Sequence, residues 1–144
     1  MKKFVTKNEK ETLALAKLLF NNLNDNITFA LIGNLGSGKT TFTKGLAKYL
    51  KIKENILSPT FNIIKVYTIP HNKNNYKYLC HVDAYRLQTF EDLKALGLDN
   101  YLDSLETITV IEWADKIKKY LPKNTFFIKF KSGKEETERI ITFK

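Results

Sequence analysis

The sequence has little of what marks a secreted or membrane protein. It contains one cysteine, Cys80, which excludes an internal disulfide framework; because Cys80 lies in an apolar run, we expect a buried free thiol. No apolar run approaches the length that crosses a bilayer, and the basic N-terminus leads into polar residues instead of a signal-type segment. We therefore expect a cytoplasmic protein without membrane association, folded as one domain over residues 1–144.

Arginine is scarce although the chain is strongly basic. The formal net charge is +9, yet among 24 basic residues only Arg86 and Arg139 are arginine. Base recognition and bidentate phosphate clamping favour arginine, so the lysine-rich composition favours a solvated surface over a specific nucleic-acid interface. The positive excess lies in residues 1–53 and 115–144, and contact of these segments with a polyanion such as tRNA stays open.

One stretch matches a phosphate-binding loop. Residues 33–40 read Gly-Asn-Leu-Gly-Ser-Gly-Lys-Thr, which fits the pattern G-x-x-x-x-G-K-[ST] at every fixed position. Residues 27–32 form a nearly continuous apolar run typical of a buried strand, and residues 40–50 carry apolar side chains at helical spacing. Strand, loop and helix therefore follow one another in the order that the motif requires.

The residue types in this loop suit a nucleotide triphosphate. Glycines let the backbone turn tightly and direct its N–H groups toward phosphates, and the following helix adds the positive end of its dipole. Lys39 supplies a mobile positive charge for the terminal phosphates. The Thr40 hydroxyl is placed to ligate the magnesium ion that accompanies them.

Two helices are predicted from capping residues and apolar spacing. The first is expected from about residue 8 to 23, ended by residues 24–26, and Phe4-Val5 before it begins an edge strand. The second is expected at 87–98, where Phe90, Leu93 and Leu96 form the buried face and Gly97 is the stop.

The rest of the chain completes an alternation of strands and helices. Further strands are expected at 62–68, 76–82, 107–111, 126–131 and 139–143, and a short helix at 114–120. We therefore predict an α/β protein with a three-layer P-loop NTPase-like fold, in which a mixed, mostly parallel central sheet with antiparallel hairpins is flanked by helices.

Two acidic residues stand where apolar strands end. Asp83 follows one strand and Glu112 follows another. Because the carboxyl ends of strands converge on the crevice where ligands bind, either acid can hold the metal while the other orients an attacking water. Each taken alone can also be an ordinary surface acid. For the base, only two walls are suggested, the turn near Glu9 and the final hairpin.

Two neighbours of these acids have open roles. Trp113 adjoins Glu112, and its residue type suits core packing as well as a site or an interface. Arg86 follows Asp83 by three residues, and it can neutralise phosphate charge, dock a partner or form a surface salt bridge.

These motifs together resemble the TsaE family, the bacterial ATPase required to form threonylcarbamoyladenosine beside the anticodon of tRNA. The matching elements, in this order and spacing, are Gly33 to Thr41, Ser58-Pro59-Thr60-Phe61, His81-x-Asp83-x-Tyr85-Arg86-Leu87 and Glu112-Trp113. The resemblance covers nearly the whole chain, and the elements after the loop are specific to the family. Asn34 and Ala114 depart from it, since Asp is usual and Pro frequent at these positions.

The resemblance implies ATP as the nucleotide and Mg²⁺ as its metal, with Thr40 and Glu112 as magnesium ligands and Asp83 near the terminal phosphate. It also implies Thr60 in a switch-like loop, with Tyr85, Arg86 and Trp113 as possible switch or partner contacts. The implied ATP-binding residues are Leu35, Gly36, Ser37, Gly38, Lys39, Thr40, Thr41 and Asp83, and the implied catalytic residues are Lys39, Asp83 and Glu112.

The resemblance further implies partner proteins. The family works with the two proteins that make and transfer the threonylcarbamoyl group, so contact with tRNA is expected to be indirect. The ATPase activity is expected to be weak alone and to depend on these partners.

Two other functions remain as alternatives. A small nucleoside or nucleotide kinase shares the loop and the size, but it needs an arginine-bearing lid for its second substrate, and the chain has two arginines. A non-enzymatic nucleic-acid-binding module rests on the net charge of +9. A GTPase is disfavoured because Asn72-Lys73-Asn74-Asn75 lacks the acid of the N-K-x-D element.

Overall fold

A mixed seven-stranded sheet forms the centre of the protein. The computed structural model describes residues 1–23 and 27–144, so the predicted turn at 24–26 lies outside the described residues. The strands are β1 (Lys2–Thr6), β2 (Thr28–Ile32), β3 (Ile64–Thr68), β4 (Tyr78–Asp83), β5 (Thr107–Glu112), β6 (Phe126–Ser132) and β7 (Arg139–Phe143). The helices are α1 (Glu9–Phe20), α2 (Lys39–Tyr49), α3 (Phe90–Ala95), α4 (Leu98–Leu102) and the 3₁₀ helix η1 (Ala114–Tyr120).

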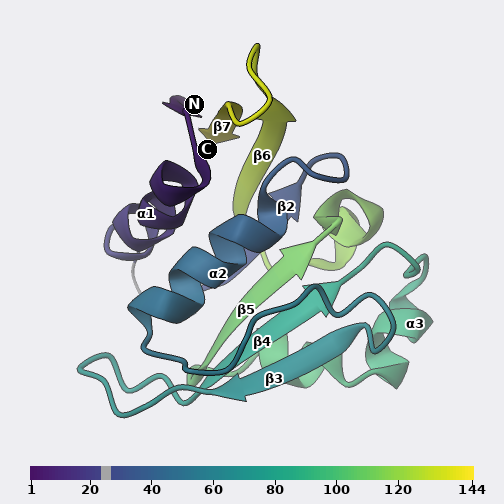
Figure 1. Cartoon of the computed structure of the whole chain (residues 1–144). Helices are drawn as coiled ribbons and strands as arrows, with labels where there is room; N and C mark the ends of the chain where they lie inside the picture. Colours follow the sequence, from purple (N-terminus) through teal and green to yellow (C-terminus); the bar gives the residue numbers. More distant parts are fainter. Residues whose placement is uncertain (24–26) are drawn as a thin grey trace.

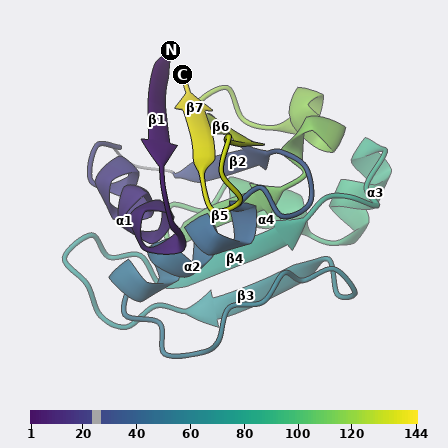
Figure 2. The ribbon, with the colours of Figure 1, turned by 45° about the horizontal axis from the view of Figure 1, so that its top comes forward.

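The strand order is β1-β7-β6-β2-β5-β4-β3. β2 pairs in parallel with β5 and β6, and β4 pairs in parallel with β5. The hairpins β3–β4 and β6–β7 are antiparallel, as is the pair β1–β7. The first strand is therefore an edge strand, as Phe4-Val5 predicted, and it brings the two termini together (Figure 2).

Helices cover both faces of this sheet. α1 and α2 lie side by side on one face (Figure 1), and their buried side chains pack with Phe29, Val110 and Ile128 of the sheet. On the other face, Leu93 and Leu98 of the short helices pack with Val82 and Ile111. The predicted fold class, a three-layer P-loop NTPase-like architecture, is confirmed. In the part of the chain that the structure describes, no helix has the length and apolarity to span a membrane.

The N-terminal cap of α1 is Asn8. The Asn8 side chain accepts a hydrogen bond from the backbone N–H of Glu11, at 2.9 Å, while the backbone N–H of Lys7 donates to the Glu11 carboxylate. Thr6 instead pairs its hydroxyl with that of Thr12. These bonds satisfy orphan donors of the first turn, so the helix begins at Glu9.

The helix predicted at 87–98 is wrong in its extent. α3 begins only at Phe90, because Thr89 and Asp92 form a reciprocal capping box. Gly97 ends it in the left-handed conformation, with φ of 69°, as predicted, but a further short helix, α4, follows at once. Phe90 lies on the surface against Tyr120 instead of on the buried face.

Gly45 on α2 allows α1 to approach closely. A Cβ at this position would lie 2.4 Å from the carbonyl oxygen of Leu13 on α1, so the helix backbones would have to separate. We expect Gly45→Ala to lower the free energy of unfolding by about 1 to 3 kcal/mol despite the better helix propensity of alanine. Urea denaturation measures this. The exposed Lys48→Ala on the same helix is the control, and equal stability of the two variants would contradict the close packing.

Cys80 is fully buried on β4, as predicted. Burial raises the pKa of its thiol to about 12. Because the thiolate is the reactive form, alkylation at pH 8 is expected to be at least about 1000-fold slower than in the chain unfolded by guanidinium. Mass spectrometry of iodoacetamide-treated protein measures both rates, and rapid labelling of the folded chain would show that β4 is accessible.

Candidate nucleotide-binding site

The predicted loop is a tight turn between β2 and the first residue of α2. Gly36 has φ of 74° and Gly38 has φ of 105°, values that side chains rarely allow. Gly33 is required for another reason, since a Cβ there would lie 2.6 Å from the carbonyl oxygen of Phe130. The loop thus presents backbone at the N-terminus of α2, which is the geometry that binds phosphate.

Lys39 begins α2, and its side chain folds back over the loop. Its Nζ donates hydrogen bonds to the carbonyl oxygens of Gly33, at 2.6 Å, and Asn34, at 2.9 Å, and it lies 4.3 Å from the centre of the Trp113 ring. Burial lowers the pKa of Lys39, while the negative charges of Glu112 and Asp83 oppose that change. The ammonium is therefore held by neutral acceptors and a ring face, and a phosphate would offer it a stronger, charged acceptor.

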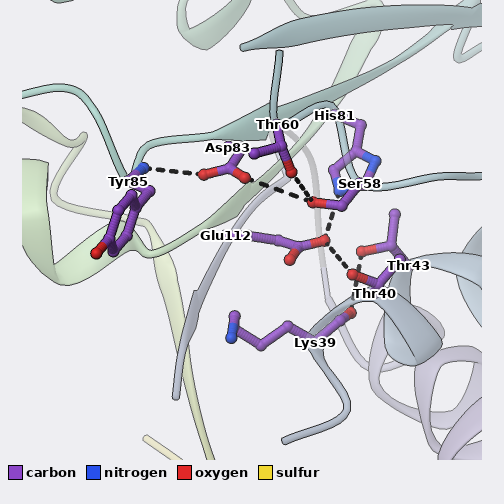
Figure 3. Close-up of polar contacts among 9 residues, drawn as sticks. All are labelled: Lys39, Thr40, Thr43, Ser58, Thr60, His81, Asp83, Tyr85 and Glu112. Carbon is purple, nitrogen blue, oxygen red and sulfur yellow. Dashed lines mark hydrogen bonds and ion pairs between the residues drawn. The ribbon is translucent and has the colours of Figure 1, made fainter. Parts of the chain in front are cut away.

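The two predicted acids stand side by side at the ends of neighbouring parallel strands. Asp83 of β4 is in register with Glu112 of β5, and their exposed fractions are 5% and 3%. The Thr40 hydroxyl donates to Glu112 Oε1 at 2.9 Å (Figure 3). Asp83 accepts from the backbone N–H of Tyr85 at 2.9 Å and from the Ser58 hydroxyl at 3.4 Å. Both carboxylates therefore face the loop.

The donor set fits a magnesium ion that arrives with a nucleotide. Thr40 and Glu112 offer two adjacent oxygen ligands, and magnesium in such sites takes one or two protein ligands plus phosphate oxygens and water. Among the described residues, no three His, Cys, Asp or Glu side chains gather into a metal cluster. These residues are therefore suited to a metal that brings most of its own ligands.

A cavity of about 730 Å³ opens in front of the loop. Its lining comprises Glu9, Thr12, Leu35, Gly36, Ser37, Gly38, Lys39, Thr40, Thr41, Ser58, Thr60, Asp83, Tyr85, Glu112, Trp113, Glu136, Thr137 and Arg139. Every predicted site residue lies on this wall except Arg86. Their chemical roles remain predictions, but one cavity brings them together.

One wall of the cavity comes from the ends of the chain. The suggested walls near Glu9 and in the final hairpin both line the cavity, and the Thr137 hydroxyl joins them by donating to the carbonyl oxygen of Lys7 at 2.7 Å. Arg139 donates to two carbonyl oxygens of its own hairpin, and its stem passes 3.6 Å from where a Cβ of Gly38 would lie. Sequence analysis suggested the final hairpin as a wall but gave no site role to Thr12, Glu136, Thr137 or Arg139, because no local motif marks them.

Trp113 and Arg86, whose roles the sequence left open, lie in different surroundings. Trp113 lines the cavity with φ of 58° and packs edge-on against Tyr85, with ring centres 5.0 Å apart, so it lies at the cavity instead of in the core, and its role in a site remains a prediction. Arg86 is exposed, and its guanidinium lies 6.0 Å from the ring centre of Phe61. Within the described ranges it forms no salt bridge, so its surface-pair interpretation is not supported.

The segment before β3 borders the same cavity. Thr60 is exposed, and its hydroxyl donates to that of Ser58 at 3.5 Å. Phe61 beside it is 87% exposed. Ile63 follows with φ of 65°, a conformation that a β-branched side chain disfavours. Thr60 lines the cavity, and its switch role remains a prediction.

Fold and site together define a class of protein, the α/β proteins with a P-loop NTPase-like fold. The particular family follows from comparison: the model described as "Threonylcarbamoyl adenosine biosynthesis protein TsaE" matches residues 6–141, and the chain belongs to this family. The resemblance stated from the motifs is thereby confirmed.

Relatives of known name agree with this assignment. The "tRNA threonylcarbamoyladenosine biosynthesis protein TsaE" of Bacillus subtilis is 39% identical over 98% of this chain and 84% of its own length. The protein of the same name from Rickettsia typhi is 40% identical over 78% of this chain and 74% of its own length. The crystal structure of Bacillus subtilis YdiB matches with a TM-score of 0.76 and 36% identity, covering 99% of this chain and 83% of that one.

Proposed function

We propose that this protein binds ATP with Mg²⁺ and hydrolyses it, in support of the threonylcarbamoyladenosine modification of tRNA. The observation that carries the proposal is the contact of the Thr40 hydroxyl with Glu112, next to a glycine-rich loop and in register with Asp83. A loop alone would support binding. The two acids beside it supply what hydrolysis needs.

Binding is proposed to use mainly backbone. The loop N–H groups and the N-terminus of α2 hold the phosphate chain, and Lys39 exchanges two carbonyl oxygens for terminal phosphate oxygens. Thr40 and Glu112 hold Mg²⁺, which neutralises charge on the phosphates when it is bound. The walls near Glu9 and Arg139 enclose the base and ribose.

Asp83 is proposed to orient the attacking water. Its carboxylate is held by Tyr85 N–H and Ser58, so it is fixed at the mouth of the cavity while it can still accept a hydrogen bond from water. Water attacks the γ-phosphorus, the bond to the bridging oxygen breaks, and ADP and phosphate leave. Because the Ser58–Thr60 segment contacts Asp83, a partner that moves this segment would change the rate.

Partner proteins complete the proposal. The relatives are named for threonylcarbamoyladenosine biosynthesis on tRNA, so we propose that the chain acts with the two proteins that make and transfer the threonylcarbamoyl group and meets tRNA through them. Exposed Phe61 and Tyr85 beside the cavity, at 87% and 55%, are candidate contacts.

Phosphate release from ATP tests the proposal. The purified chain is incubated with ATP and Mg²⁺, first alone and then with the two candidate partner proteins. Slow release that rises with the partners supports the proposal. Transfer of phosphate to a nucleoside or nucleotide would identify a kinase. ATP that stays intact under all conditions would refute hydrolysis and favour the non-enzymatic nucleic-acid-binding module.

A further inference from the structure

His81 is a buried polar side chain that the mechanism above does not use. It lies on β4, two residues before Asp83, and its exposed fraction is 0%. It therefore cannot touch a nucleotide in the cavity. Its Nε2 lies 2.8 Å from Glu112 Oε1, the same oxygen that accepts from Thr40 at 2.9 Å (Figure 3).

The hydrogen bonding of the ring fixes which nitrogen donates. Nδ1 of His81 is buried and has no hydrogen-bond partner. A proton on Nδ1 would therefore be an unsatisfied buried donor, which costs about 1 to 3 kcal/mol. The geometry therefore identifies Nε2 as the nitrogen that donates to Glu112.

Two donors on one oxygen orient the whole carboxylate. With Oε1 occupied by Thr40 and His81, the second oxygen of Glu112 points away from His81 (Figure 3). A carboxylate without the histidine could rotate about its own axis and keep only the Thr40 contact. A leucine at this fully buried position would leave no unpaired nitrogen, so the contact of Nε2 with Glu112 is what the histidine adds.

We propose that His81 is a positioning residue of the metal site, which holds Glu112 in the orientation that ligates Mg²⁺. This inference rests on the proposed function, since it assumes that Mg²⁺ binds there with ATP. Partners of this kind on metal ligands typically contribute 10- to 100-fold in metal affinity.

The experiment compares two substitutions of His81 whose side-chain amides differ in length. In His81→Gln the side-chain nitrogen reaches the place of Nε2, whereas in His81→Asn it stops short. His71→Gln in the exposed β3–β4 hairpin is the matched control, because the chain contains only these two histidines. Calorimetry measures the affinity for a non-hydrolysable ATP analogue with and without Mg²⁺.

We expect His81→Asn to lose at least about 10-fold of the affinity gained from Mg²⁺, while its affinity without Mg²⁺ stays unchanged and reports an intact fold. His81→Gln and His71→Gln are expected within about 3-fold of the parent. If the asparagine variant does not fold, His81→Leu takes its place with the same expected loss.

Three results would overturn the inference. An undiminished Mg²⁺ effect in the asparagine or leucine variant would show that Glu112 needs no such partner. An equal loss in the glutamine variant would show a packing role. A parent protein that binds the analogue without any Mg²⁺ effect would refute the proposed metal site itself, and a parent that does not bind the analogue would refute the proposed function.

Discussion

Lys39→Ala is expected to weaken ATP binding by at least about 100-fold and to abolish measurable turnover. Among the described residues, Lys39 is the one lysine on the wall of the cavity, and its ammonium already lies over the loop. Removal of one hydrogen-bond donor that stabilises transition-state charge costs roughly 2.7 to 4 kcal/mol, and Lys39 is expected to act as such a donor. Calorimetric titration with ATP and phosphate release measure the two effects.

The control for this prediction is Lys48→Ala, which removes an equal charge from the exposed side of the same helix. It is expected to bind ATP as the parent does. Full ATPase activity in the Lys39 variant would refute the assignment of Lys39 to the phosphates, and an equal loss in the Lys48 variant would point to net charge and not to the site.

Glu112→Ala is expected to bind ATP but to lose Mg²⁺-dependent hydrolysis by 10²-fold or more. The carboxylate accepts from Thr40 and is 3% exposed, so no other acid of the strand can replace it. A lost group that stabilises transition-state charge has an effect of this order. Hydrolysis is followed over a range of Mg²⁺ concentrations.

Glu112→Gln separates charge from packing in this test, because it keeps an acceptor for Thr40 and His81. It is expected to lose hydrolysis nearly as fully as the alanine variant. Glu106→Ala, on the exposed segment before β5, is the control. Unchanged turnover in the Glu112 variants would move the metal role to Asp83.

The phosphate loop and the two acids were predictable from sequence because their signals are local. A glycine pattern between an apolar strand and an amphipathic helix has one structural solution, and acids at the ends of buried strands converge at one sheet edge. The sequence left open which of the two acids contacts Thr40. The contact of Thr40 with Glu112, and that of Asp83 with Ser58, are tertiary and appear only in the folded chain.

The sequence suggested a wall in the final hairpin and left the place of Trp113 open, but it could not identify the side chains that form this wall or place Trp113 in the cavity. Thr12 and Arg139 meet at the cavity because β1 pairs with β7 across nearly the whole length of the chain, and no local pattern encodes that pairing. Trp113 depends on a left-handed backbone conformation that sequence gives no reason to expect at a tryptophan. The helix predicted at 87–98 begins later than its apolar spacing suggested, because the capping box of Thr89 sets the start of α3 at Phe90.

The pairing of β1 with β7 has a consequence for how the protein is made. During synthesis the loop at residues 33–40 emerges well before β7, which among the described strands is the one neighbour of β1 in the sheet. A nascent chain can therefore form a phosphate cradle while the opposite side of the cavity, near Thr137 and Arg139, does not yet exist. The cavity therefore has all of its walls only once β1 and β7 have paired.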